Sequence, residues 1–316
     1  MRVCTGFVAI ATLVGAASAA VAQGFPSRPV TMVVPFPPGG NTDLMARALQ
    51  TELSKALGQS VMISNKGGAA GTIGLLELVR AEPDGYTIAL TPNNPLTAQP
   101  HMLKLRYDMD TFRYICLTYY TPYVLMAGPQ APFKTFPEFV AFAKAKSENL
   151  VYGHPGVAGQ PHLVMLGVLK AIGADGLGVP FQGAGPMSHA LLGGTIMAIT
   201  ESPAVAKASN LPSLAAIADE RIAGLPEVPT MKELGYPALG FSAGGLIVPA
   251  KTPDAVVDVL EKACARAGEG GEYKAIVERL GAEPRYLPGA AFRQMFERDS
   301  VASAEAIKSA GLGANR

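Results

Sequence analysis

Apolar residues along the chain follow two patterns, short β-branched runs and longer stretches with apolar positions three or four residues apart. Residues 28–35, 61–65 and 87–91 are runs of the first kind, which predicts strands. Residues 42–57 and 74–80 predict helices between them. Because strands alternate with helices, we expect a parallel α/β sheet.

The alternation continues beyond Pro122. Strands are predicted at residues 123–128, 150–153, 178–181, 196–200 and 241–248, and helices at residues 136–146, 161–172, 186–192, 253–267, 272–280 and 289–310. No substantial strand is expected between the last three helices. These helices must therefore pack against a sheet that another part of the chain forms.

These terminal helices indicate how the chain is divided. We expect the chain to leave a first α/β lobe near Pro122 and to return to it near Ser242. The predicted domains are residues 23–122 plus 243–316 and residues 123–242, joined by two crossovers. A cleft between two lobes is the natural place for a ligand.

Composition excludes several classes of protein. The chain has 316 residues, 49% of them hydrophobic and 16% charged, with a formal net charge of +1. This apolar fraction excludes disorder. The near-zero charge, the 7% of aromatic residues and the lack of a basic run argue against a nucleic-acid partner.

Residues 1–22 have the pattern of a secretory signal peptide. Arg2 gives a basic start, residues 7–14 are apolar, and small residues lead to a cleavage site predicted near Ala22. The alternative, a membrane anchor, is disfavoured because the apolar run is shorter than the ~20 residues of a spanning helix. We therefore expect an exported protein whose mature chain has a formal charge of zero.

Cys116 and Cys264 would be the cysteines of the mature chain. An exported compartment permits a bridge between them, but both lie in apolar patterns, and we expect two buried free thiols. The histidines show no zinc-binding spacing and no Cys-x-x-Cys is present. We expect neither a metal nor a cofactor.

Two strand-to-helix loops are candidate anion sites. In residues 35–43, glycines free the backbone N–H groups at a helix start, and Asn41 or Thr42 is expected to cap it. Free N–H groups and the helix dipole suit a carboxylate or phosphate. Residues 154–162 repeat this arrangement in the second lobe. The alternative for the first loop is an ordinary capped turn.

Other side chains near these loops have open roles. His162 is expected to be a structural histidine rather than a ligand contact, whereas for His154 both roles stay open. Phe181 is placed to wall a pocket. Asn93 and Asn94 offer amides at a strand end, although an Asn-rich turn is an equal alternative.

No catalytic template is present. The chain lacks a Gly-x-Ser-x-Gly elbow, a phosphate-binding Gly-x4-Gly-Lys loop and a strand followed by Gly-x-Gly-x-x-Gly. Asp43, Glu77 and Glu201 are scattered and suggest no acid–base pair. The residues therefore do not support an enzyme, although they do not exclude one.

Four motifs in this order resemble the tripartite tricarboxylate transporter substrate-binding proteins, also called Bug receptors. They are PFPPGGNTD at residues 35–43, PDGYT at 83–87, LLGG at 191–194 and LPEVPT at 225–230. The resemblance covers residues 25–312. It implies a monomeric periplasmic receptor with a type II periplasmic-binding-protein fold that closes on a small organic acid for a membrane permease. A receptor that docks on a membrane sensor and, less favoured, an exported enzyme are the alternatives.

The resemblance also implies which residues bind the ligand. The corresponding residues are Phe36, Pro38, Gly39, Gly40, Asn41, Thr42, Asp43, Asn93, Asn94, His154, Gly156, Val157, Ala158, Gly159, Gln160, Phe181 and Glu201. Residues 154–160 lack the serines usual in the family, Phe181 and Gln182 replace a common Tyr-Lys pair, and Glu201 replaces a usual Asp. We therefore expect a ligand with little additional negative charge.

Overall fold

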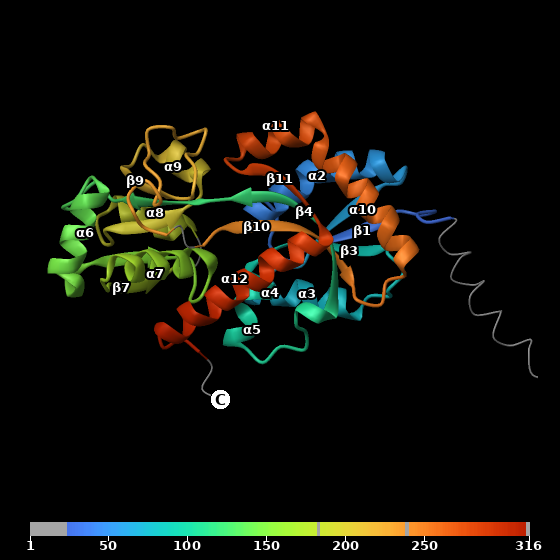
Figure 1. Ribbon diagram of the computed structural model, residues 1–316, viewed down its shortest axis with the longest axis horizontal. Coiled ribbons are helices and arrows are strands. Elements are labelled where there is room, and N and C mark those ends of the chain that lie inside the picture. The colour runs from blue at the N-terminus through green and yellow to red at the C-terminus, as the bar shows by residue number, and fades with distance from the viewer. Residues whose placement is uncertain (1–23, 182–183, 238–239, 314–316) are drawn as a thin grey trace, which may run out of the picture.

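The computed structural model describes residues 24–181, 184–237 and 240–313, which form two helix-covered β-sheets side by side (Figure 1). The first is a six-stranded sheet in the order β11-β4-β10-β3-β1-β2, and the second is a five-stranded sheet in the order β7-β6-β8-β5-β9. This two-sheet α/β architecture agrees with the predicted fold class.

The first sheet and its helices come from both ends of the described chain. Its strands are β1 (Val30–Val34), β2 (Val61–Asn65), β3 (Thr87–Pro92), β4 (Phe112–Thr121), β10 (Ser242–Pro249) and β11 (Glu283–Pro288). Its helices are α2 (Asn41–Leu57), η1 (Ala69–Gly71), α3 (Thr72–Arg80), α4 (Asn94–Thr97), α5 (Gln99–Met102), η2 (Met109–Thr111), α10 (Asp254–Glu269), α11 (Gly271–Arg279) and α12 (Gly289–Ser309).

The second sheet comes from the middle of the chain. Its strands are β5 (Tyr123–Ala127), β6 (Val151–His154), β7 (Leu177–Pro180), β8 (Ala198–Glu201) and β9 (Ser213–Ile217). Its helices are α6 (Phe136–Ala145), η3 (Ser147–Asn149), α7 (Gln160–Ile172), α8 (Ala184–Leu192) and α9 (Pro203–Ser209). The chain thus changes sheet between β4 and β5 and again between β9 and β10. The predicted domain boundaries at residues 122 and 242 stay a prediction.

The expectation of a parallel sheet is correct only for part of each sheet. Strands β2-β1-β3 and β7-β6-β8 run parallel, whereas β10, β4 and β11 in the first sheet and β5 and β9 in the second pair antiparallel. The expectation of no strand between the terminal helices is wrong, because β11 pairs with β4. Its Pro284 and Pro288 hid it in the sequence, and proline is tolerated there because β11 is an edge strand.

Buried apolar side chains fill both faces of each sheet. Helices α2, α10 and α11 cover one face of the first sheet, and α3 and α12 cover the other. Helices α6 and α7 cover one face of the second sheet, and α8 and α9 the other. A smaller cluster joins the two parts, with Ala98 and Ile307 from the first and Ala158 and Leu163 from the second.

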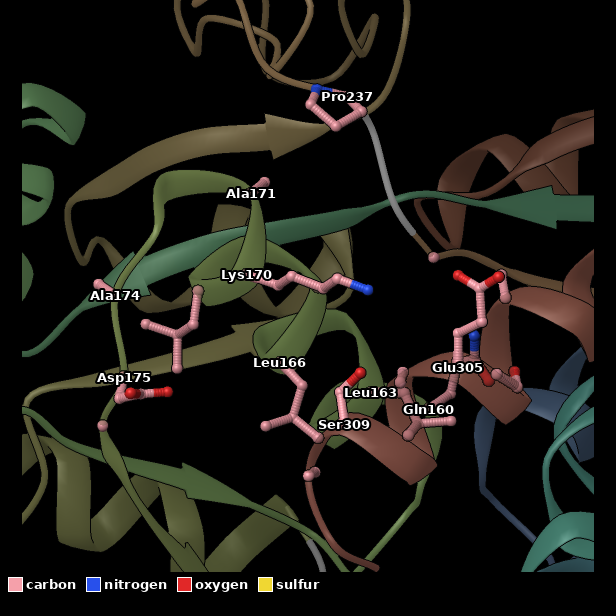
Figure 2. A pocket seen from close by; sticks show the side chains of 18 of the residues that line it. Gln160, Leu163, Leu166, Lys170, Ala171, Ala174, Asp175, Pro237, Glu305 and Ser309 are labelled. Carbon is pink, nitrogen blue, oxygen red and sulfur yellow. The ribbon is translucent and has the colours of Figure 1, made fainter.

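A cavity of about 540 Å³ lies between α7 and α12 (Figure 2). Apolar side chains of both helices line it, and Pro237 and Gly240 of the segment that returns to the first sheet close one side. None of the residues of the predicted first-lobe anion loop lines this cavity. Gln160 and Asp299 do line it.

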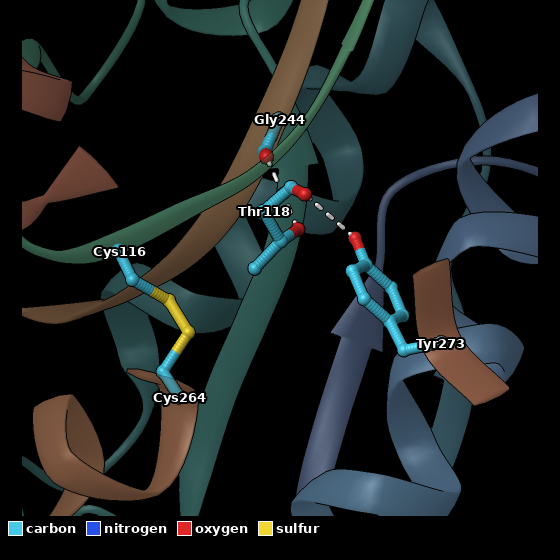
Figure 3. The surroundings of a disulfide bond; sticks show 5 residues. All are labelled: Cys116, Thr118, Gly244, Cys264 and Tyr273. Atoms are coloured by element: carbon cyan, nitrogen blue, oxygen red, sulfur yellow. Dashed lines mark hydrogen bonds between the residues drawn. A yellow bond between two sulfur atoms is a disulfide. The ribbon is translucent and has the colours of Figure 1, made fainter. Parts of the chain in front are cut away.

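A disulfide joins Cys116 of β4 to Cys264 of α10 (Figure 3). The Cα atoms are 6.5 Å apart although 148 residues separate the two cysteines in sequence. The expectation of two free thiols is therefore wrong. Both residues are fully buried as expected, but the packing of α10 across β4, which the sequence does not reveal, brings their side chains together.

The predicted signal peptide, residues 1–22, lies outside the described residues, as does Gln182. Across the described part of the chain, no helix is both long and apolar enough to span a membrane.

Candidate functional site

The β1–α2 loop presents an uncapped helix start. Gly39 adopts a φ of 80°, a conformation that favours glycine, and Gly40 occupies the N-cap position of α2 in an extended conformation. No side chain caps the helix, so the expectation that Asn41 or Thr42 does so is wrong. Both lie inside the first turn, one residue or more beyond the cap position, so the N–H groups there stay available to a ligand.

Asp43 holds this loop in place from within. One carboxylate oxygen accepts hydrogen bonds from the Gly39 N–H and from Arg47, each 2.8 Å, and the other accepts one from Asn65 at 2.9 Å. Burial would raise the pKa of Asp43, but these hydrogen bonds outweigh it and lower the pKa. Asp43 is 1% exposed, so its place in the structure indicates a positioning role rather than ligand contact.

Asn93 and Asn94, at the end of β3, point into different surroundings. Asn93 is fully buried and donates to the Phe241 carbonyl and to a carboxylate oxygen of Asp299, at 3.1 and 2.7 Å. Asn94 donates to the Ala158 carbonyl at 3.0 Å, and so joins the start of α4 to the second candidate loop. Asn93 is thus structural, while Asn94 links the two loop regions.

The β6–α7 loop repeats the geometry of the first loop. Gly159 is the N-cap of α7, and again no side chain caps the helix. Gly156 has a φ of 150°, and Ala158 has a φ of 53°. An alanine in this left-handed region is costly and persists only where its surroundings fix it. Val157, by contrast, projects outward and is 49% exposed.

A pair of stacked histidines fixes Ala158. The rings of His154 and His162 lie 3.8 Å apart and nearly parallel. Nδ1 of His162 accepts the Ala158 N–H at 3.1 Å, while Nδ1 of His154 donates to the Gly156 carbonyl at 2.9 Å. Burial, and secondarily His154, lowers the pKa of His162 to about 4, and burial lowers that of His154. Both histidines are therefore neutral supports of the loop, which agrees with the structural role expected for His162.

Phe36 and Pro95, the residue after Asn94, both lie close to Gly71. A Cβ added to Gly71 would be 2.7 Å from Cγ of Pro95 and 3.1 Å from the Phe36 ring, so these groups share a small space. Together with the Asn94–Ala158 hydrogen bond, this contact connects the first loop to the second. The described contacts do not connect Phe181 or Glu201 to the first loop. Phe181 follows β7 and packs near Gly153, and Glu201 ends β8.

Glu201 is buried at the end of β8, the central strand of the second sheet. Its carboxylate accepts the Ser202 N–H at 3.0 Å, and burial raises its pKa although that hydrogen bond opposes the shift. It pairs in register with Val124 of β5, close to the point where the chain changes sheet.

Sequence analysis missed a group of hydroxyls at this crossover. Tyr119 and Thr121 lie on the same face of β4, and their hydroxyls are buried with no hydrogen-bond partner within the described part of the chain. Thr42 and Ser242 are polar neighbours of the Tyr119 hydroxyl, and burial raises the pKa of Tyr119. The pairing of β4 with β10 places Ser242 opposite Thr121, and α2 supplies Thr42, so no local sequence signal indicated this group.

The family model for tripartite tricarboxylate transporter family receptors, TctC, matches residues 45–312. A UPF0065 protein from the gbd 5' region of Cupriavidus necator is 33% identical over 292 residues, which cover 91% of this chain and 89% of that protein. Protein BugT of Bordetella pertussis is 33% identical over 276 residues, covering 85% of this chain and 84% of BugT. The chain belongs to the TctC receptor family.

Solved structures of the family share the fold. A TctC solute-binding protein from Polaromonas is 33% identical with a TM-score of 0.78, covering 90% of this chain and 99% of that chain. MatC from Rhodopseudomonas palustris, solved with malate, is 30% identical with a TM-score of 0.76 over 90% of this chain and 100% of MatC. An R. palustris protein solved with adipate is 25% identical with a TM-score of 0.80 over 92% of this chain and 99% of that protein.

Membership of the TctC family confirms the resemblance, the fold class and the role of a solute-binding receptor rather than an enzyme. Receptors of this family are periplasmic and work with a transporter. In the described part of the chain, no cluster of three or more His, Cys, Asp or Glu side chains is arranged to hold a metal ion.

Proposed function

We propose that this TctC receptor binds a small organic acid in the periplasm, between the starts of α2 and α7, and delivers it to a membrane permease. The observation that carries the proposal is that both helices begin at a glycine with no side-chain cap. Their N–H groups and dipoles favour a carboxylate. The malate and adipate found in related structures support the same ligand class.

The ligand site would lie between two lobes, residues 23–122 plus 243–316 and residues 123–242. Phe36, Pro38, Gly39, Gly40, Asn41 and Thr42 would approach the ligand from one lobe, and Gly156 to Gln160 from the other. Asn94 supports this arrangement because it already bridges the two loop regions. Export by cleavage near Ala22 and a monomeric receptor belong to the same proposal.

The second loop supports a particular kind of acid. Its residues are apolar or neutral, and Phe181 lacks the hydroxyl of a tyrosine. Buried Glu201 carries no cationic partner among the described residues. We therefore expect one carboxylate to bind the helix starts and the rest of the ligand to be weakly charged.

A variant that fills the α2 cap tests the proposal. The Gly40 backbone has a φ of −75°, and an added Cβ would meet only the Pro37 carbonyl, at an ordinary 3.5 Å. In Gly40→Asp, the new carboxylate would bond the same N–H groups and repel an anion by about 1 to 4 kcal/mol. We expect at least an about tenfold loss of carboxylate affinity, measured by calorimetric titration with a panel of mono- and dicarboxylates and their neutral amides.

Pro253→Asp is the matched control. Pro253 is the N-cap of α10, which follows the Pro249 end of β10, whereas the β1–α2 loop lies toward the opposite end, where Gly244 pairs with Pro92. This variant adds the same charge at another helix start and should leave carboxylate binding unchanged. Equal loss in both variants, equal binding of amides and acids, or no binding of any acid would overturn the proposal. Co-purification with a sensor ectodomain instead of a permease would favour the signalling alternative.

A further inference from the structure

The cavity between α7 and α12 has a mostly apolar wall. Leu163 and Leu166 of α7 face Ala302 and Ala306 of α12 across it. Its volume of about 540 Å³ lies within the range of small-molecule sites. The cavity spans helices that cover different sheets. It shares Gln160 with the acid site proposed above, but none of the other residues assigned to that acid site lines it.

One residue that lines this cavity has a buried amide oxygen without a partner. Gln160, the first residue of α7, is 7% exposed, and no donor within the described residues reaches its Oε1. A buried amide oxygen without a hydrogen bond costs about 1–3 kcal/mol. Such a group is expected where a ligand supplies the missing donor.

A buried carboxylate lines the same cavity. Asp299 of α12 is 6% exposed, and one of its oxygens accepts hydrogen bonds from Asn93 at 2.7 Å and from Thr97 at 2.6 Å. Within the described residues, no hydrogen bond reaches the other oxygen, Oδ1. Burial raises the pKa of Asp299, although the hydrogen bonds from Thr97 and Asn93 oppose this. A bound cation would stabilise the ionised carboxylate.

Two oxygen acceptors beside an apolar wall define the chemistry of the occupant. We propose that this cavity is a second ligand site, which binds a primary amine by its ammonium group at Gln160 and Asp299 and by a short apolar chain along α7 and α12. An ammonium supplies three donors and a positive charge, which an alcohol or a carboxylate does not.

Charged side chains of both signs, Lys170, Asp175 and Glu305, also line the cavity. In Figure 2, Lys170 points toward Glu305, and Asp175 lies on the opposite side of the view. No salt bridge joins Lys170 to either carboxylate in the described chain. Discrimination between an amine and a neutral molecule is therefore assigned to the buried groups of Gln160 and Asp299.

The test uses n-hexylamine as the probe, with 1-hexanol and hexanoate as comparisons of equal chain length. Binding is measured by calorimetric titration of the purified protein. Because hydrogen bonds to charged groups are stronger than neutral ones, the amine should bind at least about tenfold more tightly than the alcohol. Ala302→Phe fills the cavity from an exposed position of α12 and should weaken amine binding at least about tenfold.

Val301→Phe is the matched control, since Val301 is 63% exposed on the same helix and does not line the cavity. It should bind the amine as the unchanged protein does. Equal binding of amine and alcohol, amine binding that survives Ala302→Phe, or no amine binding would overturn the inference. Titration of the same variants with dicarboxylates reports separately on the proposed acid site, which Ala302→Phe should leave intact.

Discussion

Removal of the Cys116–Cys264 disulfide should destabilise the protein strongly. The bridge closes a loop whose ends are 148 residues apart in sequence and which contains the whole second sheet. In the chain-entropy treatment, a loop of that length costs the unfolded chain about 5 kcal/mol of conformational freedom at 25 °C. We therefore expect Cys116→Ala with Cys264→Ala to lower the free energy of unfolding by about 5 kcal/mol.

Urea unfolding followed by circular dichroism measures this loss. With a slope of about 3 kcal/mol per molar urea, the midpoint should fall by about 1.7 M. The unchanged protein treated with reductant under unfolding conditions should approach the variant, and the variant itself should not respond to reductant. A midpoint shift below about 0.3 M, or equal sensitivity of both proteins to reductant, would refute the bridge as a major source of stability.

Three further changes test other parts of the structure. In Gly245→Ala, the new Cβ would lie 2.7 Å from Cα of Leu117. Urea unfolding should therefore show that the free energy of unfolding falls by at least about 2 kcal/mol. An unchanged midpoint would contradict the close contact between the strands. Because the pKa of His162 falls from about 6.5 unfolded to about 4 folded, the free energy of unfolding should decrease by about 3 kcal/mol as pH falls through that window. His162→Gln should flatten this dependence. An equally steep curve would show that another group causes the pH dependence of stability. Asp43→Ala should lower the thermal midpoint by several degrees, whereas Leu44→Ala, at an exposed position, should not.

Local patterns in the sequence predicted most elements of this fold. The strand at residues 61–65 was predicted with its observed bounds, because β-branched residues and flanking polar residues define it locally. Strand β11 and the antiparallel pairing of β4 with β10 depend on partners far away in sequence, and the prolines of β11 obscured its pattern. Strand direction and the disulfide were unpredictable for that same reason.

The candidate site, like the fold, could be predicted from the sequence only where the signal is local. The glycines of both loops located the two helix starts because the backbone requirement is local, but the side-chain cap expected for the first helix is absent. The buried roles of Asn93 and Asp43 were not visible, since their partners Asp299 and Asn65 come from other elements. The hydroxyls of Tyr119 and Thr121 become neighbours of the site only through strand pairing.

The two connections between the sheets differ greatly in length. Strand β4 ends at Thr121 and β5 begins at Tyr123, so Pro122 alone separates them, whereas residues 218–241 form the return connection (Figure 1). The proline ring fixes one of the two backbone torsions at this point. We expect Pro122 to act as the pivot of any relative movement of the two sheets, because the other connection is long. Ligand-induced closure would then be described by one angle, which a single pair of spectroscopic labels on α6 and α11 could follow.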